Sequence, residues 1–190
     1  VYIADVQEPA TCAYVVEVCA RLACETPEER RRFGGGDSVG RGPMSRELRL
    51  SYKQRAKALF ERGYDAYVRY AEPEGELRPR SCSGGPFDLV KLPLVTLVDS
   101  LDALAIMGNS TEFQSATQRI WHGFPSKFDF DVNVSVFETT IRVLGGLLSG
   151  HLLAVDASLN LTTDYDGELL ALALDLGERL APAFDTPTAI

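Results

Sequence analysis

The chain has 190 residues, of which 45% are hydrophobic, and it carries a formal net charge of −8 at neutral pH. This composition is typical of a globular protein, and the negative charge argues against nucleic acid or an anionic membrane surface as a partner. No apolar run reaches the roughly 18 residues that a membrane-spanning helix needs.

Other features of the chain suggest a piece of a longer secretory protein. It begins with Val1 and lacks the basic and apolar regions of a signal peptide. Glycosylation sequons nevertheless start at Asn109, Asn133 and Asn160. The cysteines lack the C-x2-C spacing of zinc sites, which favours disulfides over metal and leaves their pairing open. They are Cys12, Cys19, Cys24 and Cys82.

Residues 1–24 have the β-branched and aromatic composition of two short strands. Their pattern E-P-x-x-C-x-Y, followed by a valine-rich strand, resembles the end of a mannose 6-phosphate receptor homology domain of the glucosidase II β-subunit type. The resemblance implies that Glu8 and Tyr14 contact mannose. The upstream cysteines of that family are missing, so we expect a C-terminal remnant of a lectin-like domain. The alternative is an edge hairpin with a surface Glu8 and a packed Tyr14.

Residues 25–45 are first charged, then glycine-rich, and end near a proline. This composition predicts a flexible linker between the remnant and a domain formed by residues 46–190.

From Arg46 onward the apolar spacing predicts helices. The first helix ends at Glu72-Pro73, and residues 83–93 form a loop. A second helix covers residues 94–104 and carries Asp99 and Asp102, which we expect to hydrogen bond to neighbouring helix ends; an acidic pocket face is the alternative. Asn109 is expected to cap a helix that runs to about Trp121.

The following segment is predicted as a strongly apolar helix over roughly residues 135–154. A loop over residues 156–166 leads to a last helix over residues 167–180, which ends at Pro182. All segments after Arg46 are thus predicted to be helical and to form antiparallel hairpins.

Glu138 and Arg142 lie four residues apart in the apolar helix, so they share one face and are expected to be partly buried. One interpretation is structural: Ser135-x-x-Glu138 is a capping box, in which Glu138 accepts from the Ser135 amide and Arg142 is an exposed partner. The other is that the pair belongs to a functional site.

The stretch FDFDVNVSVFETTIRVLGGLLSGHLL resembles the signature of glycoside hydrolase family 47, the α-1,2-mannosidases of the secretory pathway. It is most similar to the ER degradation-enhancing mannosidase-like branch. The resemblance covers residues 46–190 and implies Glu138 as the catalytic acid and Arg142 as a substrate contact. It also implies that Cys82 pairs with a cysteine downstream of this chain.

The fold implied by the resemblance is an all-α, partial (α/α)7 barrel, preceded by the short β remnant and the linker. Residues 46–190 cannot close such a barrel, so we expect apolar faces to be left exposed. The implied activity is inverting hydrolysis of α-1,2-linked mannose, assisted by Ca²⁺ whose protein ligand is not in this chain. The implied partners are high-mannose N-glycans of misfolded glycoproteins in the ER lumen, in ER-associated degradation, with a protein disulfide isomerase-type protein as a further candidate.

Three functions compete at this stage. The complete domain is expected to be a hydrolase, although the fragment alone is expected to be inactive because the water-activating carboxylate comes later in the family's sequence. The alternatives are a non-catalytic protein that binds mannose glycans and an inert helical fragment.

Overall fold

The computed structural model describes residues 44–187. Glu8, Tyr14, the predicted β remnant and most of the predicted linker therefore lie outside the described residues, and the boundary near residue 45 stays a prediction. The chain divides into two compact units, one of residues 1–66 with 78–82 and one of residues 67–77 with 83–190. Most of the described structure, including Glu138, belongs to the second unit.

Helix α3 (Arg46–Tyr70) confirms the first predicted helix. The hydroxyl of Ser45 accepts a hydrogen bond from the Leu48 amide at 3.2 Å, which caps its first turn. The helix ends just before the proline-containing turn at residues 71–75, as the sequence predicted. Tyr67 near its end is 1% exposed, and its hydroxyl donates to the Glu74 carbonyl at 2.8 Å.

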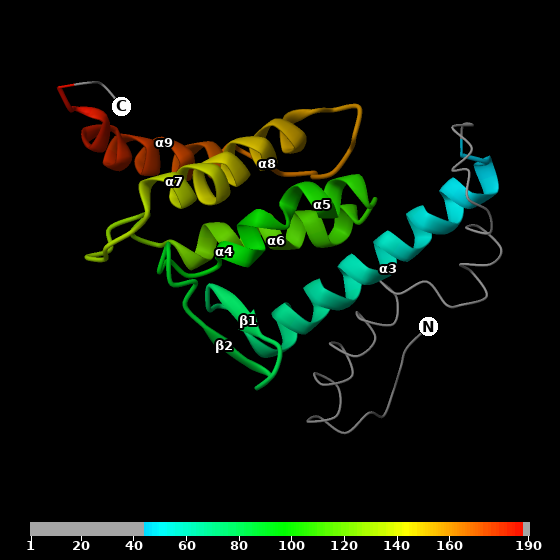
Figure 1. The fold of residues 1–190 in the computed structure, drawn as a ribbon. Coiled ribbons are helices and arrows are strands. Elements are labelled where there is room, and N and C mark those ends of the chain that lie inside the picture. The colour runs from blue at the N-terminus through cyan, green and yellow to red at the C-terminus, as the bar shows by residue number, and fades with distance from the viewer. Residues whose placement is uncertain (1–43, 188–190) are drawn as a thin grey trace. The chain divides into compact units, whose positions relative to one another are not determined.

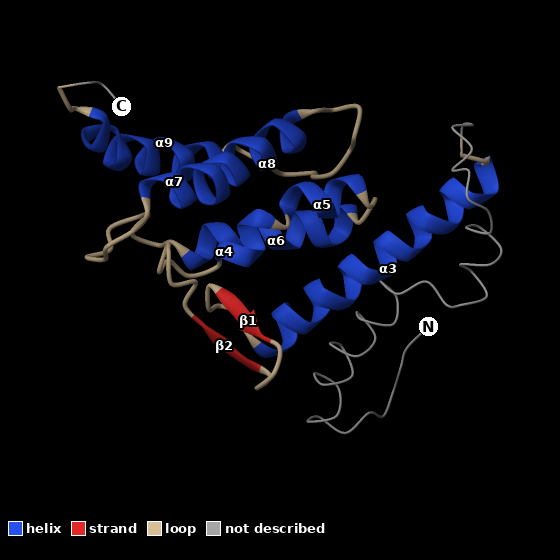
Figure 2. Cartoon of the chain, in the orientation of Figure 1, coloured by secondary structure: helices blue, strands red, loops and turns tan. Residues whose placement is uncertain are grey.

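A short hairpin follows where only turns and helices were expected. Strands β1 (Glu76–Arg78) and β2 (Ser83–Gly85) pair in a two-stranded sheet, so the prediction that every segment after Arg46 is helical is wrong here (Figure 2). Cys82 lies directly before β2. The implied pairing of Cys82 with a cysteine downstream of this chain stays a prediction.

The predicted helix over residues 94–104 is divided into α4 (Val95–Asp99) and α5 (Leu101–Ile106). The break lies at Ser100, whose hydroxyl donates to the Thr96 carbonyl at 2.6 Å. Helix α6 (Ser110–Gly123) begins after Asn109, whose side chain accepts from the Glu112 amide, and this confirms the predicted cap.

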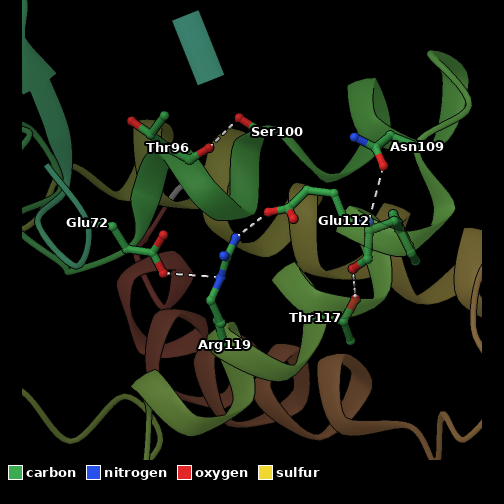
Figure 3. A network of polar contacts seen from close by, with 8 residues as sticks. Glu72, Thr96, Ser100, Asn109, Glu112, Thr117 and Arg119 are labelled. Atoms are coloured by element: carbon green, nitrogen blue, oxygen red, sulfur yellow. Dashed lines mark hydrogen bonds and ion pairs between the residues drawn. The ribbon is translucent and has the colours of Figure 1, made fainter. Parts of the chain in front are cut away.

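Arg119 on α6 links two acidic residues (Figure 3). Its guanidinium lies 3.2 Å from the carboxylate of Glu72, in the turn after α3. It also lies 2.6 Å from the carboxylate of Glu112, seven residues earlier on α6. Burial raises the pKa of Glu72, Arg119 lowers it by a smaller amount, and nearby Glu112 raises it further. The ion pairs of Arg119 therefore join the turn after α3 to α6. Burying the Glu72 carboxylate costs free energy, and the attraction to Arg119 offsets only part of that cost.

The signature segment forms one continuous helical rod of three pieces: α7 (Val136–Glu138), the π-helix η1 (Thr139–Leu144) and α8 (Gly145–Val155). The loop that follows leads to α9 (Glu168–Leu180) and the 3-10 helix η2 (Ala181–Phe184). The last helix thus turns into a 3-10 helix after Leu180, and Pro182 lies within that turn.

The helices of the second unit pack as two pairs, with α8 and α9 lying over α5 and α6 (Figure 1). The predicted helical hairpins are therefore present. Their interface is apolar and its side chains are at most 1% exposed: Leu97, Leu101, Leu104, Phe113, Ile120, Val143, Leu147, Leu169 and Leu172. No helix over residues 44–187 combines the length and apolar character needed to cross a membrane.

Candidate active site

The start of the signature helix tests the capping-box interpretation of Glu138. The Ser135 hydroxyl accepts from the Glu138 amide at 3.3 Å, so Ser135 is the N-cap as expected. The Ser135 amide, however, donates to the Leu89 carbonyl at 2.7 Å. The reciprocal half of a capping box is therefore absent, and the Glu138 carboxylate is not used to cap the helix.

The Glu138 carboxylate instead faces Arg142. Oε2 of Glu138 accepts from Nε of Arg142 at 2.6 Å, and Nη1 of Arg142 donates to Oδ2 of Asp99 on α4 at 3.1 Å. The guanidinium carbon lies 5.2 Å from the centre of the Phe87 ring, which places the cation over the aromatic face. Arg142 therefore bridges two carboxylates that come from different helices.

Burial differs among the three charged groups. The Glu138 side chain is 18% exposed, whereas Arg142 is 38% and Asp99 is 45% exposed. The pair is thus partly buried, as predicted. The hydrogen bond to Glu138 raises the pKa of Arg142, burial opposes this, and Asp99 raises it further, so the guanidinium remains charged.

The aspartates of the preceding helix do not bond to helix ends, and that expectation is wrong. Asp99 pairs with Arg142, and Asp102 accepts from the Ser149 hydroxyl at 2.5 Å. Both contacts join α4 and α5 to side chains within the signature helix. Asp99 belongs to the charged cluster of Glu138 and Arg142. Asp102 lies outside this cluster and links α5 to α8 through Ser149.

The π-helix lies directly after Glu138, and sequence patterns gave no sign of it. Segments of this kind are rare and are frequent at functional sites. The buried hydroxyls of Thr139 and Thr140 within it make no hydrogen bond to any part of the chain that the structure describes. Arg142 lies within the π-helix and still contacts Glu138, four residues before it, as it would in a regular α-helix.

The loop before the signature helix is fixed by α9, which sequence reasoning also missed. Oδ2 of Asp175 accepts from the Phe128 amide at 3.0 Å and from Nε of Arg179 at 2.9 Å. Nη1 of Arg179 also donates to Asp129 at 3.3 Å. Burial alone would raise the pKa of Asp175, but the Phe128 amide and Arg179 lower it overall. The only sequence signal was the four-residue spacing of Asp175 and Arg179.

A metal site is not formed by the described residues. Among residues 44–187, no group of three or more histidine, cysteine or acidic side chains is placed to hold an ion. The donor set therefore does not fit calcium, and no chemical step is derived through it.

Comparisons with known proteins identify the group to which these features belong. The sequence model of Glycosyl hydrolase family 47 matches residues 59–190. The mouse ER degradation-enhancing alpha-mannosidase-like protein 2 is 44% identical over 145 residues, which are 73% of this chain and 24% of that protein. Alpha-mannosidase I MNS5 of Arabidopsis thaliana is 42% identical over 165 residues, or 78% of this chain and 28% of that protein.

A solved structure supports the same grouping. The alpha-1,2-mannosidase from Trichoderma reesei superposes with a TM-score of 0.59 and 28% identity, over 73% of this chain and 29% of that chain. This chain thus spans less than a third of the length of these relatives, and the similarity confirms the helical fold expected from the sequence. The chain belongs to glycoside hydrolase family 47, and its similarity is to the ER degradation-enhancing mannosidase-like proteins.

Proposed function

We propose that residues 46–190 supply the first helices of an α-1,2-mannosidase domain, in which Glu138 donates a proton to the leaving sugar oxygen. One observation carries the proposal: the Ser135 amide is occupied by Leu89, so the Glu138 carboxylate is not needed for the cap and faces Arg142 instead. A partly buried carboxylate that the helix cap does not use is available for proton transfer to a sugar bound in the complete domain.

Arg142 and Asp99 have supporting roles in this proposal. Arg142 hydrogen bonds to sugar hydroxyls with the donors that Glu138 and Asp99 leave unused. Asp99 and the Phe87 ring contact the same guanidinium and help to hold it in place.

The chain alone is proposed to be inactive. An inverting glycosidase needs a second carboxylate, about 6.5–9.5 Å from the acid, that activates water on the other face of the sugar. Asp99 is bound to the same guanidinium as Glu138 and therefore cannot reach that opposite face while it holds Arg142. The family resemblance implies that the water-activating carboxylate and the calcium ligand come from a later part of the domain.

The proposed substrate is the high-mannose N-glycan of misfolded glycoproteins in the ER lumen, and the protein itself is proposed to be a glycoprotein. The support is the similarity of this chain to the ER degradation-enhancing alpha-mannosidase-like protein 2 of mouse and of human. A partner of the protein disulfide isomerase type stays a prediction.

The test is a chimera in which residues 59–190 replace the matching segment of the Arabidopsis relative. We expect it to release mannose from an α-1,2-linked mannose oligosaccharide, and we expect Glu138→Gln to lower the rate by about 100-fold or more. Glu178→Gln, the same change at an exposed position of α9, is the matched control and should leave the rate unchanged.

The outcomes separate the competing functions. If Glu138→Gln trims mannose as well as the unmodified chimera, the assignment of the acid is wrong. A chimera that binds the oligosaccharide without releasing mannose would favour the non-catalytic glycan-binding protein.

A further inference from the structure

A small polar cavity lies between α6, the loop after α8 and the start of α9. It encloses about 30 Å³, which exceeds the roughly 10–15 Å³ that one water molecule needs. In Figure 1 the loop between α8 and α9 and the helix α7, which ends at Glu138, lie at opposite ends of the signature helix. No residue of the candidate active site lines the cavity, so the two are separate.

We propose that this cavity binds a primary ammonium group, supplied by a small amine or by a lysine side chain of a partner protein. Three properties of the lining carry this proposal: its hydroxyl hydrogens are engaged, its two carboxylates have no basic partner, and the space is small. The proposed role of Glu138 has no part in it.

The threonine hydroxyls that line the cavity already donate their hydrogens elsewhere. The Thr117 hydroxyl donates to the carbonyl one turn earlier in α6 at 2.9 Å, and the Thr162 hydroxyl donates to the Ala154 carbonyl at 3.3 Å. Nε2 of Gln114 is likewise engaged, since it donates to Oγ1 of Thr163 at 3.1 Å. Thr117 is 4% exposed, so the lining includes a polar group that is nearly fully buried. These side chains retain mainly acceptor capacity, which calls for a ligand that donates hydrogen bonds.

Two carboxylates also line the cavity, that of Asp164 in the loop and that of Glu168 in the first turn of α9. They accept hydrogen bonds of 3.0 Å from neutral groups, the Thr163 hydroxyl and the Asp166 amide respectively. Neither carboxylate forms an ion pair with a basic residue in the part of the chain that the structure describes, and the lining contains no lysine, arginine or histidine. A positively charged ligand would supply the counter-charge that the lining lacks.

Tyr165 contributes a neutral side chain to the lining. Its hydroxyl lies 2.8 Å from Nδ1 of His151 on α8. Burial raises the pKa of Tyr165, the amides of Leu169 and Leu170 lower it by a smaller amount, and Glu168 raises it further. The phenol therefore stays protonated at neutral pH, and the negative charge of the lining comes from the two carboxylates.

A primary ammonium group matches these properties better than other ligands do. It has three donors, no acceptor and a compact positive charge, whereas a guanidinium is a wider, planar fork. A metal ion is not favoured, because no group of three or more histidine, cysteine or acidic side chains within residues 44–187 is placed to hold one. A sugar would bring only neutral hydroxyls and leave the two carboxylates without a counter-charge.

The experiment titrates the full, isotope-labelled chain with n-butylammonium and, separately, with an acetylated and amidated Gly-Lys-Gly peptide at low salt. The backbone amide NMR shifts of residues 162–168 report binding. n-Butanol and the same peptide with an acetylated lysine side chain are the neutral controls. Asp164→Asn is the test variant, because Glu168 also stabilises the N-terminus of α9. Asp131→Asn, at an exposed carboxylate in a different loop, is the matched control.

We expect saturable shifts with both charged ligands and none with the neutral controls. Asp164→Asn should weaken binding about two- to fivefold, as the loss of an exposed ion pair does, and Asp131→Asn should leave it unchanged. Added salt should weaken binding as well. Tighter binding of the peptide than of n-butylammonium would identify a lysine side chain as the ligand, and equal binding would identify a small amine.

Shifts of the same size with the neutral controls would overturn the proposal, and so would undiminished binding by the Asp164→Asn variant. The proposal is also wrong if mannose or Ca²⁺ shifts these amides while both amines leave them unchanged. None of these results depends on Glu138, so failure here is distinguishable from failure of the proposed hydrolase.

Discussion

Asp175 is the residue that determines where the loop before the signature helix lies. Its carboxylate binds the Phe128 amide and Arg179, and Arg179 in turn binds Asp129. The rings of Phe124 and Phe128 are centred 4.6 Å apart and are nearly fully buried beneath this loop. A charged acceptor for a partly buried amide is among the stronger single contacts in proteins.

We predict that Asp175→Asn destabilises the chain by roughly 1–2 kcal/mol at neutral pH, because a neutral acceptor binds the amide and Arg179 less well. The folded-state pKa of Asp175 is lowered, so its contribution is present above the unfolded pKa of about 4 and is lost as pH falls below it. The difference between variant and wild type should therefore shrink on acidification. Urea unfolding at several pH values measures it.

The exposed Asp88 is the matched control for this experiment. Asp88→Asn should change the free energy of unfolding by less than about 0.5 kcal/mol at any pH. An Asp175→Asn variant with a pH-independent loss would show that Asp175 acts through packing and not through its charge.

At the scale of the elements, two glycines bring the signature helix close to α4 and α5. A Cβ on Gly146 would lie 2.9 Å from Cγ1 and 3.1 Å from the carbonyl oxygen of Val98. A Cβ on Gly150 would lie 2.7 Å from a methyl group of Leu101. This approach is what allows Arg142, one turn before Gly146, to reach Asp99 on α4.

We predict that Gly146→Ala destabilises the chain by about 1–3 kcal/mol, because the Val98 backbone cannot move aside and overpacking outweighs the gain in helix propensity. Gly177 on α9 is the matched control, since a Cβ there meets no atom within 4 Å. Gly177→Ala should therefore stabilise by up to about 1 kcal/mol. Equal shifts of the two variants in thermal unfolding would refute the close-packing argument.

Sequence patterns predicted the elements whose signals are local. Apolar spacing predicted α3, α6 and α9. The N-cap of α6 was predicted because a cap depends only on the Asn109 side chain and the backbone of the next turn. The hairpin β1–β2 was missed because its strands are three residues long and contain no β-branched residue.

The site was predictable only in part, for the same reason. The contact between Glu138 and Arg142 was predictable from their four-residue spacing. The contacts of Asp99 and Phe87 with Arg142 were not, because they depend on how distant segments pack together. The π-helix between Glu138 and Gly145 was also missed, since apolar residues at three- and four-residue steps do not reveal an extra residue in a turn. The catalytic roles of Glu138 and Arg142 stay a prediction.

At the scale of the whole molecule, the signature helix has an apolar face with no neighbour among the described residues. Phe137, Ile141, Leu148, Leu152 and Val155 follow each other at helical spacing and are 41–68% exposed. On α9, Leu170 and Leu174 are 44% and 63% exposed. This exposure agrees with the expectation that a partial barrel leaves apolar faces uncovered.

We predict that Leu152→Glu, at a side chain that is 66% exposed, has opposite consequences in the short chain and in a completed domain. In the short chain it should change the free energy of unfolding by less than about 0.5 kcal/mol and reduce the binding of an apolar dye, because it adds a charge to an uncovered face. In the Arabidopsis chimera it should lower thermal stability markedly, because later helices would bury that charge. Gln118→Glu, at an exposed position of α6, should leave both proteins unchanged. If the chimera tolerates Leu152→Glu as well as the short chain does, this face is not covered by the later helices.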